Sequence, residues 1–156
     1  MSKLSQFLNS WKYHRTQTID LLKATPEDKL TFSPSDALGS LSKQFRHLAN
    51  IQHCYIEAIK TQKIDFTKKI YGKEFDNKNE LITALKIEDE RMLETLNKLN
   101  EKEWDKIIKW GSYNPTVYEH LFWMIDHEIM HHGQLIVYWK LLQFKFPDSW
   151  KNWGLV

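Results

Sequence analysis

The sequence has little that would indicate a disulfide-linked, membrane-spanning or nucleic-acid-binding protein. Cys54 is the only cysteine, so no intrachain disulfide can form, and we expect it to be a small buried side chain. The net charge is only +2 and the basic residues are scattered, which gives no sign of nucleic-acid binding. The apolar run at 135–139 is far too short to cross a bilayer, and residues 1–6 do not begin a signal peptide. We therefore expect a cytoplasmic protein without a membrane partner.

The composition that remains is ordinary for a globular protein, with 42% apolar and 27% charged residues. A length of 156 residues favours one hydrophobic core, so we expect a single domain over 1–156. Seven tryptophans are a high number for this length. Most should lie in the core, although an excess can also line a pocket or a subunit interface.

Four segments repeat apolar residues at helical spacing, and none alternates as a strand does. We predict helices over residues 2–23, 33–60, 77–99 and 116–144. Four long helices of this kind predict an all-α fold, a four-helix bundle with up-and-down or crossover connections.

The sequence also predicts where the helices begin and which faces they bury. Ser33 before Pro34 is typical of an N-cap, and Asn77 and Thr116 each precede a glutamate by three residues, as in a capping box. The charged run at 86–91 is most simply a solvent-facing surface. The fourth helix is apolar on almost every side, so we expect it to be the most enclosed of the four.

The most informative stretch lies in the fourth segment, where His127 and His131 are four residues apart. At about 3.6 residues per turn, both imidazoles project from one face of a helix and can reach one ion. Burying the polar side chains of this stretch costs about 1–3 kcal/mol for each unsatisfied group, which argues that they have partners. Imidazole suits zinc, nickel, copper and iron. We therefore predict that this pair binds a divalent transition metal.

The same stretch contains H-E-x-x-H, the signature of zinc proteases, in which Glu128 would be the general base. The extended signature needs glycine and histidine where this chain has Gln134 and Val137. No glutamate follows Glu128 to supply a downstream ligand, and no strand pattern is present to align a peptide. A protease is therefore a remote alternative.

The third ligand should come from upstream, where His14, His47, His53 and His120 are available. His120 lies two turns before His127, about 10 Å along the helix axis, which is too far to complete the same tight site. His47 and His53 are six residues apart, so only one of them can face the bundle axis. His47 lies near the apolar face, whereas we interpret His53 as a surface histidine. The pattern alone favours His47 only slightly.

With these motifs the chain resembles the DinB-like (DinB/YfiT) superfamily, four-helix proteins regarded as metal-dependent. The resemblance rests on a second-helix histidine in the context Phe45-Arg46-His47-Leu48-Ala49 and on the closing motif His127-Glu128-Ile129-Met130-His131-His132-Gly133-Gln134. It covers essentially the whole chain. His132 is a departure, because an arginine is common at that position. The resemblance implies a bundle in which His47, His127 and His131 are the metal ligands, with zinc or nickel as the expected metal and a coordination position left open.

Some members of this superfamily are transferases or isomerases that use a low-molecular-weight bacterial thiol. The resemblance thus implies a metal-dependent enzyme that activates water or such a thiol, for hydrolysis or S-transfer on a small molecule. We interpret Glu128 as a residue that supports the ligands rather than as a catalytic base. The alternative is a non-catalytic metal-binding or stress-response protein. Dimers are common among similar proteins, and the tryptophans and the apolar fourth helix also favour a homodimer.

Overall fold

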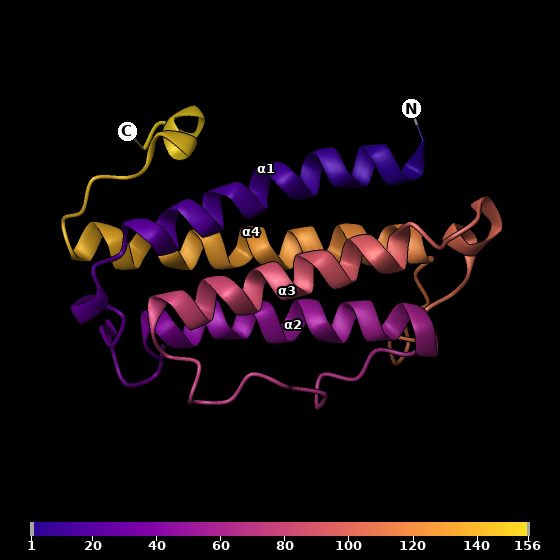
Figure 1. The fold of residues 1–156 in the computed structure, drawn as a ribbon, viewed down its shortest axis with the longest axis horizontal. Coiled ribbons are helices and arrows are strands. Elements are labelled where there is room, and N and C mark those ends of the chain that lie inside the picture. The colour runs from indigo at the N-terminus through magenta and orange to yellow at the C-terminus, as the bar shows by residue number, and fades with distance from the viewer. Residues whose placement is uncertain (1, 156) are drawn as a thin grey trace.

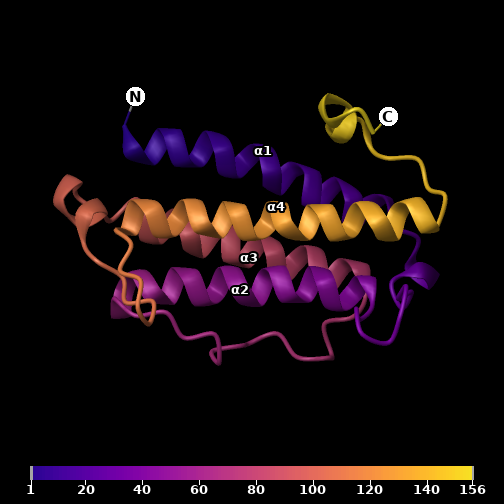
Figure 2. The same ribbon diagram turned by 180° about the vertical axis from the view of Figure 1, so that it is seen from behind.

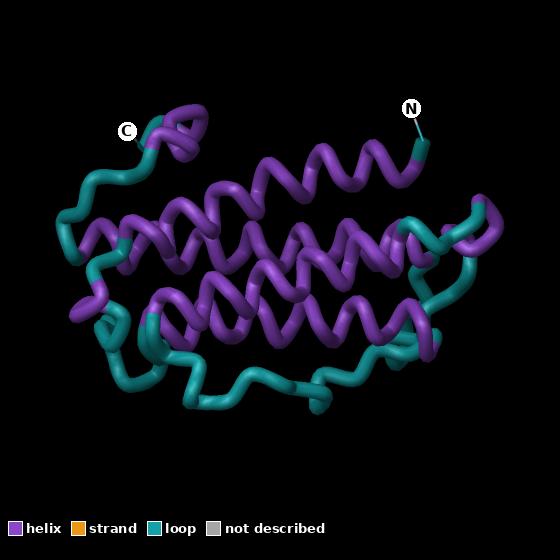
Figure 3. Tube along the Cα trace, in the orientation of Figure 1, coloured by secondary structure: helices purple, strands orange, loops and turns teal. Residues whose placement is uncertain are grey.

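The computed structural model describes residues 2–155, and over this range the protein is all-α, with isolated bridges but no strand. The bundle consists of four long helices: α1 (Lys3–Ala24), α2 (Leu41–Thr61), α3 (Lys78–Leu96) and α4 (Val117–Leu141). The remaining helices are short 3-10 turns: η1 (Glu27–Lys29), η2 (Glu101–Asp105) and η3 (Asp148–Trp153). Figure 3 shows these helices joined by loops alone. The predicted all-α bundle is confirmed.

The bundle has a crossover connection. In Figure 1, α1 and α4 run in one direction and α2 and α3 in the other, because the loop between α2 and α3 returns along the outside of α2. The helix α4 packs against both α1 and α2, and α3 packs against the same two helices (Figure 2). The two helices that carry the histidines of the predicted metal site, α2 and α4, are therefore direct neighbours.

The helix starts are as predicted for α3 and α4 but not for α2. Asn77 and Thr116 are N-caps, and both hydrogen bonds of a capping box are present at Thr116. The predicted start at Ser33 is wrong, since α2 is capped by Ser40, whose side chain accepts from a backbone N–H at 3.2 Å. Gly39, at φ +77°, is in the left-handed region, which separates the turns before it from the helix.

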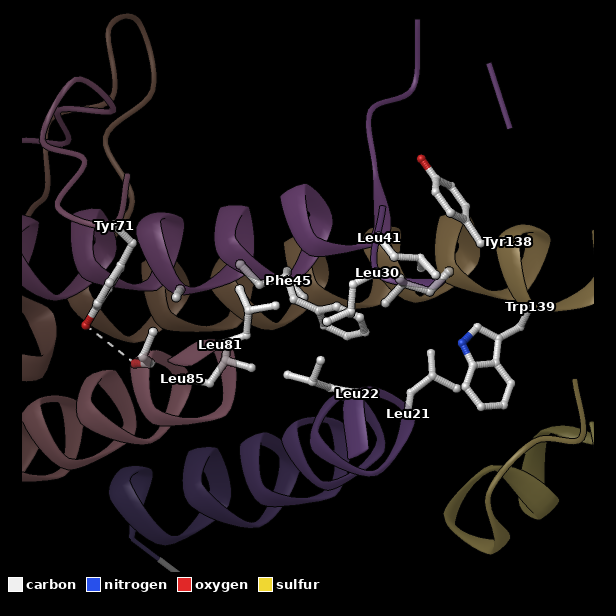
Figure 4. Packing of buried hydrophobic residues seen from close by; sticks show 14 of the residues in the cluster. Leu21, Leu22, Leu30, Leu41, Phe45, Tyr71, Leu81, Leu85, Tyr138 and Trp139 are labelled. Carbon is white, nitrogen blue, oxygen red and sulfur yellow. Dashed lines mark hydrogen bonds between the residues drawn. The ribbon is translucent and has the colours of Figure 1, made fainter. Parts of the chain in front are cut away.

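The core consists of two apolar clusters, one toward each end of the bundle. The first joins the end of α1 to the start of α2 and α3 and the end of α4, and Figure 4 shows part of it, including Leu21, Phe45 and Trp139. The second cluster, at the other end of the bundle, includes Phe7 and Met124. Between them, α1, α3 and α4 carry buried polar residues: His14, Arg15, Gln17, Thr18, Glu88, Glu128, His131 and His132. A polar layer thus divides the core at mid-length.

Two predictions about helix faces are wrong. The charged run on α3 is not wholly solvent-facing, because Glu88 is fully buried. Nor is α4 the most enclosed helix, since Met130, Val137 and Leu141 are exposed while α2 buries more of its residues, Cys54 among them. The crossover loop explains the burial of α2, because it covers the outer face of that helix. Over residues 2–155, no helix combines the length and apolar character that a membrane span requires.

Candidate metal centre

Three histidines meet between α2 and α4. His47 on α2 faces His127 and His131 on α4, and their candidate ligand atoms all lie within 4.8 Å of one another. The Nε2 atoms of His47 and His127 are 3.3 Å apart. The ring centroid of His131 lies 4.8 Å from that of His47 and 4.6 Å from that of His127. The structure therefore brings together the three histidines that the resemblance to the DinB-like superfamily indicated as metal ligands.

The spacing of these nitrogens fits a shared ion. Nitrogen ligands at about 2.0–2.1 Å from a tetrahedral zinc ion are separated by about 3.3–3.4 Å. The distance of 3.3 Å between the Nε2 atoms of His47 and His127 has this value. Two ring nitrogens at that distance cannot both carry hydrogen, so at least one of them has a free lone pair. The three imidazoles could therefore hold one metal ion with only a small movement.

The electrostatics of the site keep the imidazoles neutral. Burial lowers the pKa of His47 to about 4 and that of His127 to about 3, and it also lowers the pKa of His131. Repulsion from the neighbouring imidazoles adds to the effect, and Lys43 and Lys69 lower the pKa of His47 further. At neutral pH each ring is thus uncharged, which is the state in which histidine binds metals.

The comparison with known proteins supports the same family. The sequence profile of the DinB family matches residues 1–143, which is most of the chain. The chain belongs to the DinB family. Curated proteins give no match.

Two solved structures resemble this DinB protein in fold. A DinB-like protein from Bacillus subtilis has a TM-score of 0.75 and 24% identity, and the alignment covers 92% of this chain and 97% of the other. A DinB-like protein from Bacillus cereus has a TM-score of 0.74 and 17% identity, with 91% and 94% covered. At these identities the likeness concerns the fold alone.

The motif glutamate of this DinB protein, Glu128, is directed toward α1. Its Oε1 accepts a hydrogen bond from the hydroxyl of Thr18 at 2.5 Å, and its Oε2 lies 3.1 Å from the guanidinium of Arg15. Burial raises the pKa of the Glu128 carboxyl, and Arg15 and Thr18 oppose that rise. The carboxylate is therefore part of the polar layer between α1 and α4.

The histidine that departs from the common motif, His132, joins the same layer. Its Nε2 lies 2.7 Å from Thr18 Oγ1, whose hydrogen is donated to Glu128, so Nε2–H of His132 is the donor. Its ring also packs on Trp150 at a centroid distance of 5.0 Å. His131 and His132 are adjacent in sequence yet face different helices, and only His131 belongs to the candidate metal centre.

Two of the other upstream histidines, His120 and His53, have hydrogen-bond partners of their own, whereas the buried Nδ1 of His14 has none. Trp110 donates to Nδ1 of His120 at 2.9 Å, and the opposite ring nitrogen lies 2.9 Å from the carbonyl of Tyr55. The interpretation of His53 as a surface residue is wrong, because it is only 7% exposed and its Nδ1 lies 3.3 Å from Glu88. Among residues 2–155, only His47, His127 and His131 form a group close enough to share an ion.

Proposed function

We propose that this DinB protein is a metal-dependent enzyme in which His47, His127 and His131 bind one zinc or nickel ion. The observation that carries this proposal is the meeting of three neutral imidazoles from two helices, whose candidate ligand atoms lie within 4.8 Å of one another. Such an ion would lower the pKa of a bound water or low-molecular-weight thiol, because three neutral ligands leave its charge uncompensated. The proposed reaction is attack of that water or thiol on a small electrophile, by hydrolysis or S-transfer.

The surroundings of the site favour a small substrate. His47 and His127 are partly exposed while His131 is buried, so solvent reaches the proposed site at the first two histidines. The apolar clusters beyond the polar layer limit the entry of bulk water and strengthen electrostatic effects at the site. Lys43 and Lys69, whose charges act on His47, would attract a negatively charged group. Residues 2–155 offer no strand that could align an extended peptide.

The arrangement of Glu128 supports a different role from that of a protease base. Its two carboxylate oxygens are occupied by Thr18 and Arg15, which belong to α1. We propose that Glu128 holds α1 against α4 and thereby supports the helix that carries two of the ligands.

Turnover of a small electrophile with bacillithiol or another cellular thiol tests the proposed activity. We expect the metal-loaded wild-type protein to be at least about 100-fold faster than His131→Ala. The variant loses a metal ligand, and with it the electrostatic stabilisation of the bound hydroxide or thiolate. His53→Gln, outside the cluster, is the matched control and should keep the wild-type rate. Equal rates for wild type and His131→Ala would favour a non-catalytic metal-binding protein instead.

We also propose that the protein is a homodimer that associates through α4. Met130, Val137 and Leu141 are 59%, 50% and 57% exposed, and their spacing places them along one face of the helix. Gly133 lies on the same face, and a Cβ placed there would have no atom within 4 Å, so a second helix could approach closely. Exposed apolar residues that share one helix face are typical of an interaction surface.

Sedimentation equilibrium at micromolar concentration measures the proposed association. We expect a dimer for the wild type and a monomer for Val137→Glu, because the substitution would bury a charge at the interface. Ile87→Glu, at a position on α3 that is 42% exposed, is the control and should leave the dimer intact. A wild-type species of 18.8 kDa, the mass of one chain, would contradict the proposal.

A further inference from the structure

A glutamine on α2 contacts one of the candidate ligands on α4. The Nδ1 atom of His131 lies 2.9 Å from Oε1 of Gln44, and both side chains are buried. An amide oxygen can only accept a hydrogen bond, so Nδ1 of His131 must carry the hydrogen. In a neutral imidazole the other nitrogen, Nε2, then has the free lone pair.

The orientation of the Gln44 amide is itself fixed by its neighbours. Its Nε2 donates to the backbone carbonyl of Leu38 at 2.9 Å and to the hydroxyl of Tyr138 at 3.3 Å. A carbonyl cannot donate, so the amide NH₂ group must face Leu38. The Tyr138 hydroxyl donates in turn to the carbonyl of Gly39 at 2.8 Å, which leaves its lone pairs to accept from Gln44. The amide oxygen is therefore held toward His131.

We propose that Gln44 is a positioning residue, which fixes His131 in the Nδ1–H tautomer with Nε2 free to bind the metal. This inference rests on the proposed metal site and adds the residue that orients one of its ligands. Gln44 precedes His47 by three residues, so the same face of α2 supplies one ligand and orients another. A hydrogen-bond acceptor behind a metal-bound histidine sets the tautomer and ring orientation and makes the nitrogen ligand more basic.

Gln134 provides a matched comparison, because it is a second glutamine near His131. It follows His131 by three residues on α4 and lies close enough to act on the pKa of that ring. However, its buried Oε1 has no hydrogen-bond partner of normal geometry. The geometry thus indicates that the Nδ1–H group of His131 donates its hydrogen bond to Gln44 and not to Gln134.

Long-range ¹H–¹⁵N NMR spectra of metal-free, histidine-labelled protein test the tautomer directly. We expect His131 to be Nδ1–H in the wild type, in Gln44→Glu and in Gln134→Leu, since each of these proteins has a hydrogen-bond acceptor at position 44. Gln44→Leu should show a mixture with the Nε2–H form. A wild-type His131 in the Nε2–H form would overturn the proposal without any variant, and so would loss of Nδ1–H in Gln134→Leu but not in Gln44→Leu.

Metal affinity measured by chelator competition tests the consequence of this tautomer. We expect Gln44→Leu to bind zinc about 10–100-fold more weakly, and Gln44→Glu to restore binding, because the carboxylate is also an acceptor. The absorption spectrum of the cobalt-substituted protein should change in Gln44→Leu and not in Gln134→Leu. Unchanged affinity in Gln44→Leu would overturn the positioning role. A wild type that binds no metal would refute the proposed function, while the tautomer of the metal-free protein would still decide the assignment of Gln44.

Discussion

Replacing Arg15 with methionine is expected to lower the free energy of unfolding by about 3–5 kcal/mol, because it leaves a buried carboxylate without its cation. Arg15 is 5% exposed and lies 3.1 Å from Glu128, which is 2% exposed. Its guanidinium also donates to Gln52 at 2.7 Å and lies 3.4 Å from Asp89. No other cation is bonded to Glu128 among the described residues, so the loss cannot be offset locally. Urea denaturation of the two proteins measures the difference.

Two further variants separate charge pairing from a general loss of packing. Lys60→Met removes the surface pair with Glu57, where the two groups are 2.9 Å apart, and should cost less than about 1 kcal/mol. Adding Glu128→Gln to Arg15→Met should recover part of the stability, because the amide oxygen can still accept from Thr18 without a buried charge. Two results would contradict a stabilising role for the buried pair between α1 and α4. One is an equal loss of unfolding free energy in Arg15→Met and Lys60→Met, and the other is no recovery of that free energy in the double variant.

The features that depend on nearby residues could be predicted from the sequence. The cap at Thr116 depends on a glutamate three residues away, and the shared face of His127 and His131 depends on one turn of helix. Both are local relations that the helical period determines. The start of α2 does not follow from the sequence in this way, because Ser33 followed by proline has the composition of a cap, whereas the chain forms turns until Ser40.

The features that depend on the crossover loop could not be predicted in this way. Asn50 fixes that loop to α2, since its side-chain oxygen accepts from the N–H groups of Ile70 and Tyr71 and its amide donates to the Tyr71 carbonyl. The hydroxyl of Tyr71 then donates to Glu88 at 2.8 Å. Glu88 is buried at this contact, although its charge favoured solvent, and it lies on the apolar face of α3 between Leu85 and Met92. His53 is buried beside Glu88, on a face of α2 that the periodicity assigns to solvent.

The partners of the polar residues on α4 also lie on other helices. In the sequence, Thr18 is visible only as an interruption of the apolar stripe of α1, and nothing there connects it with Glu128. Gln44 has no local signal, because its role depends on the packing of α2 against α4. A polar residue that interrupts an apolar stripe is thus the one signal that could have indicated the polar layer.

Removing any one of the three histidines should lower metal affinity more than about 100-fold, since the loss of a ligand exceeds the effect of changing its hydrogen-bond partner. His47→Ala is the most informative, because His47 alone comes from α2 and the remaining pair lies on one helix. His53→Ala should leave affinity unchanged, because His53 bonds within the separate group of Glu88 and Arg91. Circular dichroism of each variant checks that the bundle has folded.

Metal analysis of protein purified without a histidine tag, by inductively coupled plasma mass spectrometry after loading and desalting, tests the three-histidine site most directly. We expect about one zinc or nickel ion per chain for the wild type and for His53→Ala, and almost none for His47→Ala. Full occupancy in His47→Ala together with loss of metal in His53→Ala would contradict the proposed site.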